Sequence, residues 1–127
     1  MMSHEPLIAI VEDDESFRES VQALLQSAGR HAVTFASAEQ FLASGAAATA
    51  DCLILDLRMP GINGLELQRR MRAAGFRIPT IVITAYADDV SRARALAAGA
   101  TAFLPKPFQP DAFLQAIDAA MRESWPS

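Results

Sequence analysis

Four apolar stretches and one alternating stretch recur along the chain, each followed by more polar sequence. Continuous runs of β-branched residues and leucine predict strands that are buried on both faces, as in a parallel sheet. These runs are residues 7–11 (LIAIV), 52–57 (CLILDL), 80–84 (TIVIT) and 102–106 (AFLPK). Residues 31–36 (HAVTFA) alternate between apolar and polar side chains, which is typical of an edge strand.

The segments between these runs carry apolar residues at helical spacing, with start and stop signals at their ends. They predict helices from Asp14 to Gly29, from Ser37 to Gly45, over 64–74, over 88–98 and from Pro110 onwards. The second begins with a Ser-x-x-Gln capping box. Five strands that alternate with five helices predict the α/β class, with a parallel sheet, right-handed crossovers and helices on both faces.

Composition narrows the class of protein. A chain of 127 residues with 51% apolar and 20% charged residues fits one globular domain. The net charge of −4, without a basic block, argues against nucleic-acid binding by this chain itself. Its single cysteine excludes an internal disulfide, and neither a signal peptide nor a membrane span is visible, so we expect no membrane partner and a cytoplasmic location.

Polar side chains gather where the predicted strands end. Glu12 and Asp13 follow the first strand, Asp56 lies in the third, Thr84 ends the fourth and Lys106 ends the fifth. In open sheets of this kind, ligands bind beyond the carboxyl ends of the strands, where the strand order reverses. We therefore expect these five side chains to meet at one edge of the sheet.

The chemistry of this group indicates phosphoryl transfer to a carboxylate. Clustered carboxylates without histidine or cysteine suit a hard cation, Mg²⁺ or Mn²⁺. Lys106 and Thr84 offer the donors that phosphoryl oxygens need, and Asp56 is the candidate nucleophile.

Each residue also has a structural interpretation. Asp14 can be the N-cap of the first helix, and we assign Asp14 and Glu15 to that role. Thr84 suits any β-branched strand position, and Lys106 could extend from a strand end into solvent. Asp56 is harder to explain structurally, because a carboxylate within an apolar strand needs a partner or a shifted pKa. The functional interpretation depends on the combination.

Four motifs in order, VEDD, LILDLRMPGINGLEL, IVITAYAD and AGATAFLPKPF, resemble the receiver domains of bacterial two-component response regulators. The DLRMPGINGLEL and ASAEQFL segments look most like the FixJ branch. The resemblance covers essentially the whole chain and implies one receiver domain over residues 1–127, with a flavodoxin-like (βα)5 fold and strand order 2-1-3-4-5. It also implies a sensor histidine kinase as phosphoryl donor, and a signalling phosphoacceptor rather than an enzyme.

By this resemblance, Asp56 is the phosphoacceptor and Lys106 contacts the phosphoryl group. Mg²⁺ would be bound directly by Asp13 and through water by Glu12, with Asp56 and the backbone carbonyl of Arg58 as further metal ligands. Many receivers have Asp where Glu12 stands, but the longer side chain still reaches a metal-bound water.

The resemblance also assigns residues to switching. Thr84 is the switch hydroxyl and Phe103 the switch aromatic, which we expect to turn from outward to buried on phosphorylation. Arg58 and Tyr86, each two residues beyond a site residue, would influence the lifetime of the phosphorylated state. Lys106–Pro107 is in the place of a cis peptide bond.

The output surface is expected on helix 88–98 and the last strand. That helix offers Val90, Leu96 and alanines to the core, so it should be loosely held and able to shift. We expect this face to form a homodimer or to release an effector. We expect no effector domain after the last helix, which would make the chain either a stand-alone receiver or the N-terminal part of a transcription regulator.

Three alternatives from other classes remain. A haloacid-dehalogenase-type phosphatase also combines an Asp nucleophile, Mg²⁺ and Lys, but has a second carboxylate where Arg58 stands. A flavodoxin-like cofactor binder needs phosphate-binding donors after the first strand, where this chain has EDDES. A receiver-like module that is never phosphorylated would not need Asp56, Thr84 and Lys106 together.

Overall fold

A computed structural model describes residues 6–85 and 87–124, with side chains described as far as residue 122. Within these residues the strands are β1 (Leu7–Val11), β2 (His31–Phe35), β3 (Cys52–Asp56), β4 (Thr80–Thr84) and β5 (Ala102–Pro105). The helices are α1 (Glu15–Ser27), α2 (Ala38–Ser44), α3 (Gly64–Ala73), α4 (Asp89–Ala97) and α5 (Pro110–Ser124), with a 3₁₀ turn at Ala46–Ala48. The alternation predicted from the sequence is confirmed, although β2, β3 and β5 each end one residue earlier than expected.

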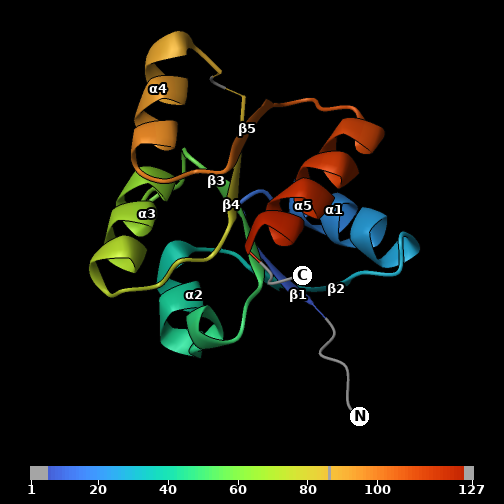
Figure 1. The fold of residues 1–127 in the computed structure, drawn as a ribbon, viewed down its shortest axis with the longest axis horizontal. Helices are drawn as coiled ribbons and strands as arrows, with labels where there is room; N and C mark the ends of the chain where they lie inside the picture. Colours follow the sequence, from blue (N-terminus) through green and yellow to red (C-terminus); the bar gives the residue numbers. More distant parts are fainter. Residues whose placement is uncertain (1–5, 86, 125–127) are drawn as a thin grey trace.

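The strands form one parallel sheet in the order β2-β1-β3-β4-β5. The order reverses between β1 and β3, so the carboxyl ends of these two strands lie on either side of the switch point. Figure 1 shows α1 and α5 on one face of the sheet and α2, α3 and α4 on the other. This is the doubly covered α/β fold that the apolar runs predict.

Two apolar layers hold the helices to the sheet. On one face, buried side chains of α1 and α5, among them Leu25 and Phe113, pack on β1, β3 and β4. On the other face, Phe41 of α2 and Leu67 of α3 pack on the alternate residues of β1 and β3. Because each strand residue of β3 and β4 is buried from one side or the other, these strands need the continuous apolar runs seen in the sequence.

Side chains cap the helices where the sequence predicts. Asp14 is the N-cap of α1, and its carboxylate accepts a hydrogen bond from the Phe17 N–H. Ser37 caps α2 through the Gln40 N–H, whereas the Gln40 side chain accepts from the N–H of Ala36, one residue before the cap. The structural role assigned to Asp14 is therefore confirmed, and its carboxylate is engaged away from the acidic cluster.

Helix α4 differs from its prediction. Val90 is 61% exposed and Leu96 is 41% exposed, so neither side chain enters the core as expected. Ala95 is the buried residue of this fully described helix, and it packs with Val82 and Phe103. A single alanine buries little apolar area, so a loosely held helix stays a prediction, now based on this small buried area. Among the described helices, none is long and apolar enough to cross a membrane.

Candidate functional site

The predicted site residues meet at the carboxyl edge of the sheet. Val11 pairs with Leu55 in the β1–β3 ladder, which places Glu12 and Asp56 at the ends of adjacent strands. Thr84 ends β4 and pairs with Pro105, so Lys106 follows directly at the end of β5. The Lys106 N–H donates to the Thr84 carbonyl at 2.9 Å, which fixes the backbone after β5 against β4. The prediction that parallel strand ends would bring these residues together is confirmed.

Lys106 bridges two of the acids. Its Nζ lies 2.7 Å from Glu12 Oε1 and 3.2 Å from Asp56 Oδ2. Both carboxylates are buried, with Glu12 3% and Asp56 7% exposed. Because a carboxylate without a partner is strongly disfavoured in such a place, the ammonium group compensates for the burial of both.

Glu12 is held in an environment that disfavours its charge. Burial raises the pKa of Glu12 from 4.5 to about 7, although hydrogen bonds from Lys106 and from the Asp14 N–H oppose the rise. The negative charge of Asp56 adds to it. For Lys106, burial would lower the pKa, but the hydrogen bond to Glu12 and the charge of Asp56 outweigh burial and raise it. Glu12 is thus an acid that takes up a proton near neutral pH, beside a firmly charged lysine.

Asp13 completes an acidic cluster with Glu12 and Asp56. One carboxylate oxygen of each residue lies within 4.8 Å of the others, and Asp13 is exposed while the other two are buried. Three carboxylate oxygens, open to solvent on one side, form a donor set that suits a hard divalent cation such as Mg²⁺. The residues present therefore fit the Mg²⁺ or Mn²⁺ ion expected from the sequence.

The loop between β3 and α3 helps to fix the Asp56 carboxylate. The Arg58 N–H donates to Asp56 Oδ1 at 3.2 Å, so each carboxylate oxygen has a donor. Gly64 leaves no room for a side chain, because an added Cβ would lie 2.3 Å from the Asp56 carbonyl oxygen. Its N–H donates to the Leu57 carbonyl at 3.0 Å. The loop thus folds back tightly on the residue that it follows.

Two residues of α1 support the site without a clear signal in the sequence. The Lys106 ammonium lies 4.1 Å from the centroid of the Phe17 ring, a cation–π arrangement. Phe17 in turn packs edge-on against Phe108. Arg18 donates to the Glu12 carbonyl at 2.8 Å. From the sequence alone, Phe17 is predicted to be an ordinary apolar residue of a helix, and Arg18 is predicted to be a surface residue.

The two predicted switch residues, Thr84 and Phe103, are both buried. Thr84 is fully buried at the end of β4. Phe103 is only 9% exposed and packs with Val82 and Ala95, so the expectation that it starts in an outward position is wrong. The apolar pocket between α4 and β5 already encloses its ring. The predicted lifetime residue Tyr86 lies outside the described residues. The Lys106–Pro107 peptide bond is cis, as expected.

This fold and this arrangement of acids, threonine and lysine define a class. The sequence profile of the response regulator receiver domain matches residues 8–118, which is most of the chain. The chain belongs to the receiver domain family of two-component response regulators, whose members are signalling phosphoacceptor domains. The phosphatase and the flavodoxin-like binder are therefore not favoured.

Individual members of this family are similar to the chain in sequence and in structure. Nodulation protein W of Bradyrhizobium diazoefficiens is 39% identical over 118 residues, covering 93% of this chain and 52% of that protein. The transcriptional regulatory protein FixJ of the same organism is 35% identical over 94% of this chain and 58% of its own length. The crystal structure of FixJ-N superposes with a TM-score of 0.87 at 35% identity, covering 98% of this chain and 99% of that one. The chain thus spans about half the length of these curated relatives.

Proposed function

We propose that Asp56 accepts a phosphoryl group from the phosphohistidine of a sensor histidine kinase. The observation that carries this proposal is the Lys106 ammonium, held between the Asp56 and Glu12 carboxylates at a sheet edge. Of the acids in the cluster, Asp56 alone lies within a strand, and donors to both of its oxygens hold its carboxylate in place. Its carboxylate is therefore the best oriented nucleophile.

In the proposed reaction, an Asp56 oxygen attacks phosphorus while the phosphorus–nitrogen bond to the kinase histidine breaks. The electron pair of that bond and a proton go to the histidine, and an acyl phosphate remains on Asp56. Lys106 is close enough to shift from the carboxylate to a phosphoryl oxygen, which gains a charge-assisted hydrogen bond. The same groups would assist a separate hydrolysis step, in which water attacks phosphorus, the bond from phosphorus to the Asp56 oxygen breaks, and inorganic phosphate leaves with the Asp56 carboxylate restored.

Glu12, Asp13 and Asp56 would hold Mg²⁺, or Mn²⁺, together with the backbone carbonyl of Arg58. When bound, the ion would neutralise charge on the transferred phosphoryl oxygens. The roles of the protein residues are to orient the cluster and to exclude water from one side of it. Arg58, exposed beside Asp56, and Tyr86 are the proposed modulators of phosphoryl lifetime.

The signal would leave through α4 and β5. A phosphoryl group on Asp56 adds oxygens that need donors, and the Thr84 hydroxyl is one strand position beyond the ladder partner of Asp56. Movement of Thr84 would disturb the pocket of Phe103, the switch aromatic, and release Ala95 of α4. We propose that this remodelled face forms a homodimer or frees an attached, transcriptional effector domain.

Intact-mass measurement after incubation with acetyl phosphate and Mg²⁺ tests the chemistry. Wild type and Asp111→Asn, which removes an exposed acid from α5, should each gain one phosphoryl group, whereas Asp56→Asn should gain none. A phosphorylated Asp56→Asn protein would contradict the assignment.

Hydrogen exchange at residues 84–108 with a beryllofluoride mimic, and sedimentation of the same sample, test the switch. Changes confined to α1 or α2 would contradict it.

A further inference from the structure

A cavity lies at the opposite edge of the sheet from Asp56. It has a volume of about 280 Å³, is open to solvent, and is bounded by the end of α3, the α3–β4 connection, the start of β4 and the α4–β5 turn. Leu53, at the start of β3, lines it, whereas Asp56 ends the same strand. Three residues of extended chain separate the two sites by about 10 Å. The cavity is therefore distinct from the acidic cluster.

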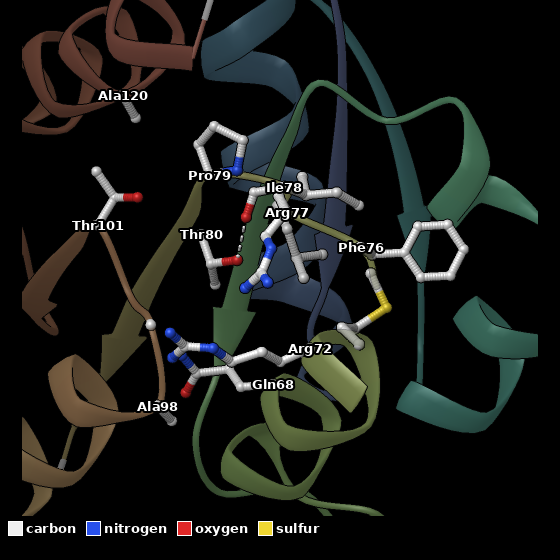
Figure 2. Close-up of a pocket in the computed structure, with 13 residues that line it drawn as sticks. Gln68, Arg72, Phe76, Arg77, Ile78, Pro79, Thr80, Ala98, Thr101 and Ala120 are labelled. Carbon is white, nitrogen blue, oxygen red and sulfur yellow. Dashed lines mark hydrogen bonds between the residues drawn. The ribbon is translucent and has the colours of Figure 1, made fainter. Parts of the chain in front are cut away.

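Two arginines give this cavity a positive charge. Arg72 at the end of α3 and Arg77 before β4 both line it, and no acidic residue does. Figure 2 shows the Arg72 side chain reaching from α3 towards Ala98 and the Arg77 guanidinium lying beside Thr80. Among the described residues, neither guanidinium has a carboxylate partner within 4.0 Å. Their charge is thus available to a ligand.

The stretch of chain that carries both arginines adds no negative charge. Residues 67–80 contain four arginines and no acidic residue, in a protein whose total charge is −4. An anion near this stretch is therefore attracted, whereas the edge around Glu12 and Asp13 repels it.

The remaining wall combines an apolar surface with an incompletely paired amide. Met71, Phe76, Ile78 and Pro79 contribute apolar surface. Gln68 is 5% exposed and donates to the Ala95 carbonyl at 3.3 Å, while its Oε1 is buried without a hydrogen-bond partner. A buried amide oxygen normally has a donor, so a ligand hydroxyl or a shifted Arg72 would satisfy it.

We propose that this cavity binds a small organic oxyanion, a carboxylate or phosphate group attached to a short apolar body. The oxyanion would form charge-assisted hydrogen bonds with Arg72 and Arg77, and the apolar body would lie against Ile78 and Pro79. Gln68 links the cavity to α4 through Ala95, so an occupant would also bear on the helix proposed to move on phosphorylation.

The test is an amide NMR titration of the metal-free protein at low ionic strength with hexanoate, hexyl phosphate and the neutral control hexanol. We expect saturable shifts at residues 76–80 and 98–101 for at least one oxyanion, with a Kd of about 1 mM or below. Hexanol should bind at least about tenfold more weakly, because it lacks the charge that the arginines recognise. Comparison of the two oxyanions identifies the preferred head group.

Variants show whether oxyanion binding depends on the two arginines of the cavity or only on the total positive charge of the protein. Arg72→Gln/Arg77→Gln should weaken binding by about tenfold or more, since two charge-assisted contacts are lost. The matched control Arg92→Gln/Arg122→Gln removes the same charge from exposed positions outside the cavity and should bind as wild type does. Thr101→Phe, at an exposed lining position, should block the cavity without touching the arginines. Absence of saturable shifts, equal loss in the control pair, or unchanged binding in Thr101→Phe would overturn the proposal.

Discussion

Replacing Glu12 by glutamine should stabilise the metal-free protein in a pH-dependent way. Burial raises the pKa of Glu12 from 4.5 to about 7, so between these pH values the folded protein keeps a proton that the unfolded chain has released. The free energy of unfolding must then fall as the pH rises through this interval. Because a tenfold change in proton affinity corresponds to about 1.4 kcal/mol, the penalty reaches about 3 kcal/mol above pH 7.

The variant removes this titration but keeps an acceptor for Lys106. Relative to wild type, Glu12→Gln should therefore gain about 2–3 kcal/mol between pH 5 and pH 8. At pH 8 the net stabilisation should be about 1–2 kcal/mol, because Lys106 loses a charged partner and keeps Asp56. Urea unfolding followed by circular dichroism, in EDTA, gives these values if the slopes of the two proteins agree.

Glu19→Gln is the matched control, since it removes one exposed glutamate from α1. Its difference from wild type should stay within about 0.5 kcal/mol at both pH values. If the difference in unfolding free energy between Glu12→Gln and wild type is the same at pH 5 and pH 8, then the pKa of Glu12 is not raised by burial. A variant that loses stability at pH 8 would refute the reasoning more strongly.

Three further predictions follow from the site. Mg²⁺ should bind more tightly as the pH rises through about 7, because Glu12 must lose its proton, and calorimetry should show proton release on binding. Asp13→Asn should weaken Mg²⁺ binding yet raise the melting temperature of the metal-free protein; an unchanged or lower value argues against repulsion within the cluster. Gly64→Ala should lose about 1–3 kcal/mol of stability in urea unfolding, because its Cβ meets the Asp56 carbonyl; Ala73→Gly, on the exposed face of the same helix, should lose no more than about 1 kcal/mol.

The sequence predicts the fold because each apolar run has a single structural interpretation. Residues 52–56 and 80–84 are too continuously apolar for a half-exposed strand, and parallel order follows from the helices between them. The convergence of Glu12, Asp56 and Lys106 follows in turn, since parallel strands end at one edge. The position of the site was thus predictable from topology, and its suitability for a hard cation from the chemistry of its oxygens.

Other features were not predictable, because they depend on packing between distant segments. The Phe17 ring under Lys106 joins positions 89 residues apart, and its sequence signal is that of any apolar helix position. Helix α4 has few large apolar residues, so the face that it buries is set by contact with Phe103 rather than by its own pattern. The buried position of Phe103 reflects the same contact.

Chemical location of the phosphoryl group tests the central claim most directly. An aspartyl phosphate is an acyl phosphate, which borohydride reduces to homoserine, so the modified residue can be identified in the peptides of the acetyl-phosphate-treated protein. We expect homoserine at position 56 when Mg²⁺ is present. It should be absent without Mg²⁺, and absent when Lys106→Met removes the bridging ammonium. Homoserine at position 13, or at any acid away from this edge of the sheet, would contradict it.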